Sequence, residues 1–587
     1  MDALDLLDDM DTIHTLFNDI PCAAEPNVEP VPVARIQYTP DFAYVMGLYR
    51  SMVEHRLDPQ FLHTPRLLLL LAVVLRKCPA HYSAWKMRRD IVLDGTKMMS
   101  CTRENLQLLL PQPVHCWEDH LSKTQTPCDP VNLLLKTYPT LSEAEQLLVD
   151  CWLPSRGDIF AQSSEASGGG ASLWKSALWE LRVTLPFSTT NPKNFQVWHH
   201  RKEVLHRALA STPPEALLSK GSFEEYLQAA LFGTTGTSSN PFDWIDEREL
   251  CDQIFQDDSK NYHLWSHRCW FLSAIPFLLM PYAFSHYTNL KLDDLRGNNE
   301  RLSLVLRQSV DPAQLSTDTF GFVLPPEHRQ LPSLLWQEWE YTTMHISADW
   351  FNNSAWCHRH MLLRTRLIEP LVDSFVNSDC GDLEWMSELL RLQCWREMEY
   401  ALQWAIVEPC NECPFVYARG VADIYQDQFV TLHRRSKPGS SRLDDDVVLE
   451  SFELHRSLCK ALSDVVQPHL EARQNDTAMW EKRTHFIRRN THQAQAGEFH
   501  TLFHILRELW VESLSFETRA RLHIQLPPSR CSPIDADYRA DDWSVLENFF
   551  ISSERRALDL VKSLYQLDGI RSKYWKNEAH LVLHRLY

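Results

Sequence analysis

One phrase recurs along this chain and constrains its fold more than any other feature. It begins with Asn, Asp or His, has a Trp four positions later, and has an Arg three positions after the Trp. The five copies are His81–Arg88, Asn194–Arg201, Asn261–Arg268, Asn352–Arg359 and Asp476–Arg483. Residues three or four apart share one side of an α-helix, and Asn and Asp are favoured N-cap residues. Each copy therefore predicts a helix that starts at the phrase.

Apolar residues with helical spacing precede these phrases, for example in Thr64–Lys77 and Glu247–Gln256. Each phrase is thus predicted to be the second helix of an antiparallel hairpin, with its Trp and Arg packed in the repeat core. Such hairpins bury their apolar faces only by stacking on one another. The sequence therefore predicts an all-α fold, a TPR-like α–α solenoid of helical hairpins.

The repeats are widely spaced. Successive Trp residues of the phrase stand 113, 67, 91 and 124 positions apart, whereas a helical hairpin needs about 34 residues. We therefore expect a repeat domain over 31–587 with hairpins around Trp85, Trp198, Trp265 and Trp356, and an eroded repeat near Tyr417; whether the Trp480 copy is a true repeat stays open. Long insertions are expected at about 97–185, 205–240, 275–340 and 430–550. Residues 1–30, acidic and containing Pro26 and Pro30, are predicted to be a disordered arm.

Composition excludes several classes of protein. The formal charge of −19, from 77 acidic and 58 basic residues, argues against a nucleic-acid-binding surface. No phosphate-binding glycine loop or HExxH motif is present. The acidic start is unlike a signal peptide, and no apolar run is long enough to span a bilayer, so a cytoplasmic protein with reduced cysteines is expected. Cys410 and Cys413 are interpreted as free thiols, and Cys357–His360 as packing residues rather than metal ligands.

Two phrases closely resemble the α-subunit repeats of protein prenyltransferases: Asn191–Arg201 and Lys260–Arg268. Asn352–Trp356 is similar to a further repeat of that family, Val33–Phe42 to the lead-in of farnesyltransferase α subunits, and Asp568–Trp575 to the last helix. The resemblance implies a right-handed, crescent-shaped superhelix. It also implies the α subunit of a farnesyltransferase or type I geranylgeranyltransferase, which moves a prenyl group from a prenyl diphosphate to the Cys of a C-terminal CaaX motif.

In such an enzyme a β subunit is the partner and the owner of the metal chemistry. The resemblance implies that Zn²⁺ is bound by the β subunit, that Mg²⁺ accompanies the prenyl diphosphate, and that this chain holds no metal and is inactive alone. The expected partners are the β subunit of farnesyltransferase, or of geranylgeranyltransferase type I, and CaaX proteins. Neither nucleic-acid binding nor membrane insertion is expected.

Candidate site residues cluster where the second helices begin. Lys193 and Lys260 stand immediately before predicted N-caps, and a lysine beside a helix N-terminus makes a local anion site. The resemblance implies diphosphate contact and catalysis for Lys193, with Tyr262 and His263 near the reacting groups. It implies substrate binding for Gln196, which would donate to the CaaX carboxylate, and for Tyr82 and Lys260 in the cleft. Phe195 replaces a family Tyr, so no hydroxyl acts there.

Two alternatives remain open at the sequence level. The first is a non-catalytic helical-repeat scaffold that binds a protein or a peptide. The second is the α subunit of a Rab geranylgeranyltransferase, although such subunits lack the lead-in that Val33–Phe42 resembles. Gain of prenylation activity on adding the chain to a β subunit discriminates against the first, and a requirement for an escort protein supports the second.

Overall fold

The computed structural model describes the ranges 4–17, 20, 22–23, 37–54, 65–93, 170–232, 246–276, 334–377, 382–408, 411–436, 447, 450–451 and 453–461, which contain helices and no strand. The prediction of an all-α fold is confirmed over this part of the chain. Two compact units divide it, Met1–Leu279 and Met280–Tyr587, and each is described by itself. The Trp480 copy and Asp568–Trp575 lie outside the described residues, and the superhelical course of the whole chain stays a prediction.

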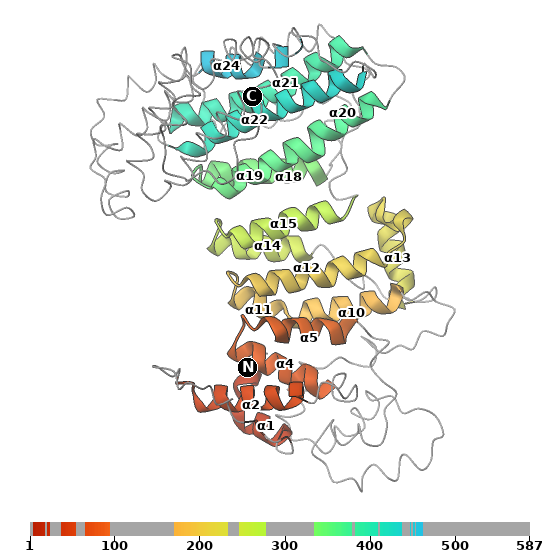
Figure 1. Cartoon of the computed structure of the whole chain (residues 1–587), viewed down its shortest axis with the longest axis vertical. Coiled ribbons are helices and arrows are strands. Elements are labelled where there is room, and N and C mark those ends of the chain that lie inside the picture. Colours follow the sequence, from red (N-terminus) through yellow and green to blue (C-terminus); the bar gives the residue numbers. More distant parts are fainter. Residues whose placement is uncertain are drawn as a thin grey trace, which may run out of the picture. The chain divides into compact units, whose positions relative to one another are not determined.

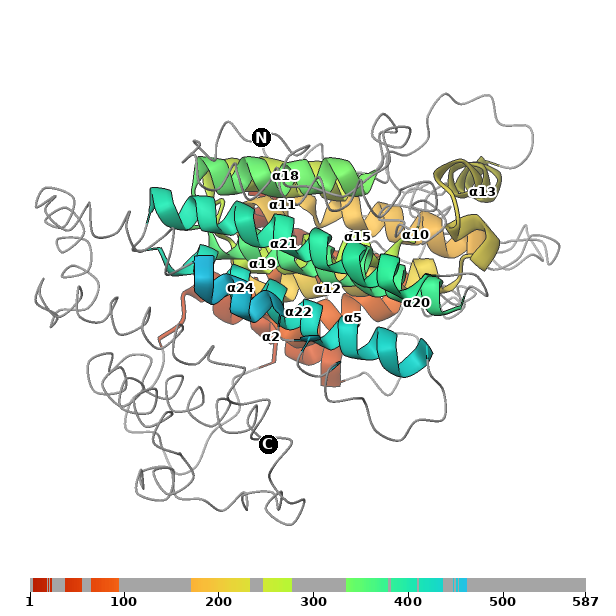
Figure 2. The same cartoon turned by 90° about the horizontal axis from the view of Figure 1, so that it is seen from above.

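The described residues of the first unit form three helical hairpins of the repeat, which are stacked in chain order (Figure 1). The second helix of each hairpin packs against the second helix of the next, and α10 and α12 lie side by side (Figures 1 and 2). The hairpins are α4 (Pro65–Lys77) with α5 (Tyr82–Leu93), α10 (Gly170–Val183) and α11 (Leu185–Thr190) with α12 (Phe195–Ala210), and α14 (Asp246–Asp257) with α15 (Tyr262–Ala274).

The second unit continues the same construction. Its first hairpin pairs α18 (Leu334–Ala348) with α19 (Asn353–Leu362), which continues through the π-helical turn η8 (Leu363–Ile368) into α20 (Glu369–Val376). Its second hairpin pairs two long helices, α21 (Leu383–Val407) and α22 (Glu412–Ser436), and α24 (Glu453–Ala461) packs on α22. Pro370 at the start of α20 has no N–H to donate, which favours the irregular turn before it.

The phrase fixes the turn of each hairpin through two local bonds. The Trp Nε1 donates to the carbonyl six residues upstream, at 2.8 Å from Trp85 to Pro79, from Trp198 to Pro192 and from Trp265 to Ser259, and at 3.0 Å from Trp356 to Trp350. The side chains of Asn194, Asn261 and Asn352 accept from the first backbone N–H groups of their helices. The predicted caps are therefore present, and all four Trp residues are buried.

Buried glutamates join one hairpin to the next. Glu180 of α10 accepts from Arg88 of the preceding hairpin at 2.6 and 2.9 Å, and its Oε1 lies 2.8 Å from His200 Nε2 of its own hairpin. Glu247 of α14 is held in the same way by Arg201 and by His267, whose Nε2 lies 2.7 Å from Oε2. The Arg of the phrase thus connects neighbouring hairpins, in addition to packing in its own repeat.

The second unit repeats this arrangement with one change. Arg359 donates to Glu397 at 2.7 and 3.0 Å, and His358 lies 2.8 Å from Glu338. Tyr417 takes the place of the His, and its hydroxyl donates to Glu397 at 2.8 Å. Asn411 caps α22 by accepting from Cys413 N at 3.0 Å. The segment interpreted from the sequence as an eroded repeat therefore keeps the cap and the glutamate contact of the phrase.

The N-terminal residues differ from the predicted disordered arm. The turn η1 (Asp5–Asp8) and helix α1 (Met10–Leu16) are folded, and their apolar side chains are buried in one core with α4. Asp8 also forms ion pairs with Arg76 at 2.6 Å and Lys77 at 2.8 Å. Acidic residues in this stretch alternate with Leu, Ile and Phe, so the segment has an apolar face that α4 can cover.

The predicted insertions are partly folded as well. Helix α13 (Lys220–Phe232), within 205–240, packs on α10, where the rings of Trp174 and Phe223 lie 5.5 Å apart. Helix α10 occupies the end of 97–185, α18 the end of 275–340, and α24 part of 430–550. Among the described helices, none is both long and apolar enough to cross a membrane.

We expect Glu247→Ala to destabilise the protein by about 3–5 kcal/mol, because it leaves the buried Arg201 guanidinium without its carboxylate. Glu249→Ala, on the exposed side of the same helix, should change the free energy of unfolding by less than about 0.5 kcal/mol. Urea denaturation of the full-length variants measures both. Equal effects of the two substitutions would contradict the structural role of Glu247.

The same carboxylate predicts a pH dependence. Burial alone would raise the pKa of Glu247, but the Arg201 charge and the bond to His267 outweigh it and lower that pKa from 4.5 to about 2. The folded state therefore binds fewer protons, and this contribution to stability is lost as the pH falls from 4.5 towards 2. We expect the difference in unfolding free energy between wild type and Glu247→Gln to shrink over that range. A constant difference would contradict this assignment.

Candidate functional site

The starts of the second helices form an exposed edge of the first unit. Three residues before each Trp stands an aromatic side chain: Tyr82 is 54 % exposed, Phe195 56 % and Tyr262 66 %. The Phe195 ring lies 6.1 Å from the His263 ring, so the helix starts of α12 and α15 are in contact. We call Tyr82, Phe195 and Tyr262, with the turn residues next to them, the helix-start edge.

Lys193 lies in the turn between α11 and α12, directly before the cap residue Asn194. Its side chain is 78 % exposed, and Nζ lies 3.2 Å from Asp258 Oδ2 in the turn between α14 and α15. An ion pair in this setting is weak because water screens it. The ammonium is thus positioned by the next hairpin and still accessible to an anion at the start of α12.

His263 lies between two of the exposed rings. Its ring centroid is 3.9 Å from Tyr262 and 6.1 Å from Phe195, and its backbone N–H donates to Asn261 at 3.1 Å. Burial lowers the pKa of His263, so the imidazole is neutral at pH 7. A neutral imidazole can either donate or accept a hydrogen bond at this edge.

The other predicted residues are distributed around this centre. Gln196 is half-buried at the start of α12, where its backbone N–H donates to Asn194 at 2.9 Å, and Lys260 is exposed in the next turn. Tyr82 starts α5, the second helix of the neighbouring hairpin. Two sets of contacts link the second and third hairpins here: Lys193 pairs with Asp258, and His263 lies against both Phe195 and Tyr262. The structure therefore gathers residues from two hairpins and leaves Tyr82 on a third.

Sequence reasoning missed two residues beside this group, His199 and Arg89. The His199 ring stacks on Phe195 at 5.7 Å. Burial and the charges of Arg89 and Lys202 lower the pKa of His199 against the opposing effect of Glu203. Arg89 is only 5 % exposed, and its Nε has no hydrogen-bond partner. The doubled Arg88-Arg89 in the first phrase was the available signal. Arg89 of α5 and Lys202 of α12 thus place positive charge near His199, opposed by Glu203.

The described part of the chain offers no cluster of metal-ligand side chains. No group of three or more His, Cys, Asp or Glu residues there could hold a metal ion. His360 lies against Gly420, where an added Cβ would come within 2.9 Å of His360 Nε2, and burial raises the pKa of the Cys357 thiol. His360 is thus packed against α22, whereas Cys357 is an exposed free thiol. Cys410 lies outside the described residues, and the zinc expected on a partner stays an expectation.

Two of the hairpins match a known family. The sequence matches the family model "Protein prenyltransferase alpha subunit repeat" over residues 178–208 and 244–275. These segments include the turns that carry Lys193, Asp258 and His263. The resemblance of the phrases to α-subunit repeats is thus supported for the second and third hairpins, which contribute Phe195 and Tyr262 to the helix-start edge.

A human protein provides a second comparison. The chain is 24 % identical over 195 residues to the human "Protein prenyltransferase alpha subunit repeat-containing protein 1". The aligned part covers 29 % of this chain and 46 % of the human protein. The chain therefore spans about half the length of the curated relative it matches. The shared feature is the helical repeat.

We expect Lys193→Ala to leave the fold intact. Its ion pair with Asp258 is largely exposed, so its loss should change the free energy of unfolding by less than about 1 kcal/mol. Urea denaturation of wild type and variant at pH 7 measures this. A loss of several kcal/mol would show that Lys193 has a structural role instead.

Proposed function

We propose that this chain is an α-type subunit of a heterodimeric protein prenyltransferase, which transfers a farnesyl or geranylgeranyl group from a prenyl diphosphate to the Cys of a C-terminal CaaX motif. The observation that carries this proposal is the exposed Lys193 in the turn before α12, which pairs with Asp258 of the next hairpin while Phe195, two residues on, lies against His263. These residues lie within the segments that match α-subunit repeats.

The chemistry explains why a cation belongs at this place. As the thiolate sulfur bonds to C1 of the prenyl group, the C1–O bond breaks and the electron pair leaves with the diphosphate. Cationic and N–H groups aimed at that growing negative charge lower the barrier. Lys193 Nζ and the first N–H groups of α12 are such groups, and Asp258 keeps the ammonium near the helix start in the absence of substrate.

The remaining chemistry is assigned to a β subunit. Zn²⁺ there would hold the substrate Cys as a thiolate, and Mg²⁺ would accompany the diphosphate. On this chain, Gln196 is proposed to donate to the CaaX carboxylate, Lys260 to add positive charge, and Tyr82 to line the cleft. The substrate thiol must be reduced, so we place the reaction in the cytoplasm.

A non-catalytic scaffold is the second candidate function. The exposure of Tyr82, Phe195 and Tyr262 favours it, because aromatic side chains at a surface are common in protein-binding sites. Phe195 also lacks the hydroxyl that the family Tyr would bring. In this alternative the helix-start edge binds a protein, and Lys193 takes no part in a reaction.

The test is single-turnover prenyl transfer by the purified complex of this chain with a prenyltransferase β subunit. We expect Lys193→Ala to lower the rate of the chemical step by about 10²-fold or more, because a donor to the leaving group is lost. Formation of the heterodimer, measured by analytical ultracentrifugation, should be unchanged.

Lys220→Ala is the matched control, since Lys220 is an exposed lysine of α13 in the same unit and pairs with Glu224. Its rate should equal that of wild type. An unchanged chemical rate in Lys193→Ala would refute the catalytic role of Lys193. A chain that binds a β subunit and adds no prenylation activity would establish the scaffold instead.

A further inference from the structure

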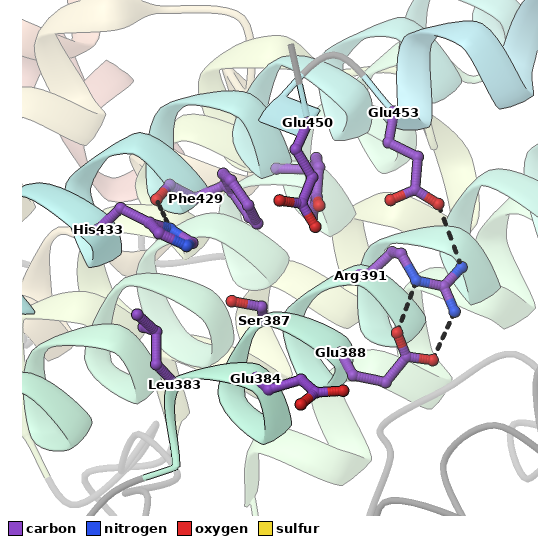
Figure 3. A pocket seen from close by; sticks show the side chains of 10 residues that line it. Leu383, Glu384, Ser387, Glu388, Arg391, Phe429, His433, Glu450 and Glu453 are labelled. Atoms are coloured by element: carbon purple, nitrogen blue, oxygen red, sulfur yellow. Dashed lines mark hydrogen bonds and ion pairs between the residues drawn. The ribbon is translucent and has the colours of Figure 1, made fainter. Parts of the chain in front are cut away.

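A pocket of 610 Å³ lies in the second unit, among α21, α22 and the start of α24 (Figure 3). It lies apart in sequence from every residue of the helix-start edge, and the proposed prenyl transfer makes no use of it. Its size is within the range of pockets that bind small molecules or single side chains.

Negative charge dominates the lining of this pocket. Among the described residues, four carboxylates and one guanidinium line it, with a summed formal charge of −3; they are Glu384, Glu388, Glu450, Glu453 and Arg391. Arg391 Nε donates to Glu388 Oε2 at 2.8 Å, a second bond joins the same two side chains, and Arg391 Nη1 lies 3.8 Å from Glu453. The arginine thus cancels only part of the carboxylate charge.

One wall of the pocket is aromatic. Tyr425, Phe429 and His433 stand four residues apart on α22 and so share one side of that helix. Their rings are 5.4 Å apart between Tyr425 and Phe429 and 4.2 Å apart between Phe429 and His433. Aromatic faces attract cations, and planar guanidinium groups stack on them.

Two hydroxyl groups in the lining lack a hydrogen-bond partner. Ser387 Oγ is buried and makes no hydrogen bond. Tyr425 is only 1 % exposed, and no described residue bonds to its hydroxyl. Buried polar groups are normally satisfied, so the Ser387 hydroxyl points to a polar ligand that fills the pocket, and the Tyr425 hydroxyl can add a second contact to it.

We propose that this pocket binds a guanidinium group. Its negative charge favours a cation, and its acceptors and aromatic wall suit a planar group with five N–H donors. The described residues contain no group of three acidic, His or Cys side chains that could hold a metal ion, which argues for an organic cation. The guanidinium belongs either to a free small molecule or to an arginine side chain of a peptide.

Isothermal titration calorimetry on the full-length chain tests the proposal with three probes: agmatine, cadaverine, and an uncharged-terminus tripeptide with a central arginine. We expect agmatine to bind at least about tenfold more tightly than cadaverine, because the ammonium lacks the planar fork. Binding of the tripeptide as well identifies an arginine side chain as the occupant, and binding of agmatine alone identifies a small molecule.

Variants locate the binding. Glu450→Gln removes one lining charge and should weaken agmatine binding at least about tenfold, since bonds to charged groups are the strong ones. Tyr425→Phe keeps the ring, removes the unpartnered hydroxyl, and should weaken binding by a smaller factor. Glu369→Gln is the matched control, because Glu369 is a residue of α20 that lies outside the pocket and pairs with Arg364. The Glu369→Gln variant should bind agmatine as tightly as wild type does.

Far-UV circular dichroism checks that each variant is folded. The proposal is overturned if agmatine does not bind wild type, if cadaverine binds as tightly as agmatine, or if Glu450→Gln and Glu369→Gln bind agmatine equally well. Because none of these measurements involves prenyl transfer, their failure would leave the proposed function of the helix-start edge unaffected.

Discussion

The buried carboxylate shared between two hairpins is the interaction on which the rest of the architecture depends. Glu180 accepts from Arg88 of one hairpin and lies against His200 of its own, and Glu247 repeats this with Arg201 and His267. A buried arginine without its carboxylate costs several kcal/mol, so Arg88, Arg201 and Arg359 each require the glutamate of the following hairpin, whereas Arg268 bonds to Asp252 of its own hairpin. These ion pairs fix how each hairpin is aligned along the next one, which apolar packing alone does not achieve.

The ends of this series show how the constraint is released. The first hairpin has Leu67 and Met87 at the positions of the glutamate and the histidine, so both polar partners are replaced by apolar ones. Such paired replacement leaves no unsatisfied group and can be nearly neutral. In the last described hairpin Ala418 stands at the Arg position, and no further glutamate is required. The N-terminal segment with α1 covers the first of these ends.

Sequence could predict what is local in this fold. The cap bonds and the Trp Nε1 bonds join residues that are at most about eight positions apart in the sequence. The phrase therefore predicts them, and with them the helix starts. The glutamate and histidine that contact each other are 20 residues apart in the sequence, and Arg88 and Glu180 are 92 residues apart. Because a long insertion separates Arg88 from Glu180, the sequence pattern did not predict their contact. The same reason explains the pocket: its lining runs from Leu383 to Glu453, joined by neither a motif nor a constant spacing. Helix α1 was not predicted, because its apolar residues alternate with acidic ones and the segment was interpreted as disordered.

The division of labour inside the phrase explains where chemistry can be placed. Trp, His and Arg are buried and determine the stacking, and the cap residue is buried or half-buried. The residues five, three and two positions before the Trp lie at the exposed end of the helix. Changes there cost little stability, so Phe195 is compatible with the fold. The position five before the Trp is Ala80, Lys193, Lys260 and Phe351 in the four hairpins. Positive charge at a helix start thus belongs to two neighbouring hairpins of the first unit, which confines the proposed diphosphate chemistry to the turn where Lys193 pairs with Asp258.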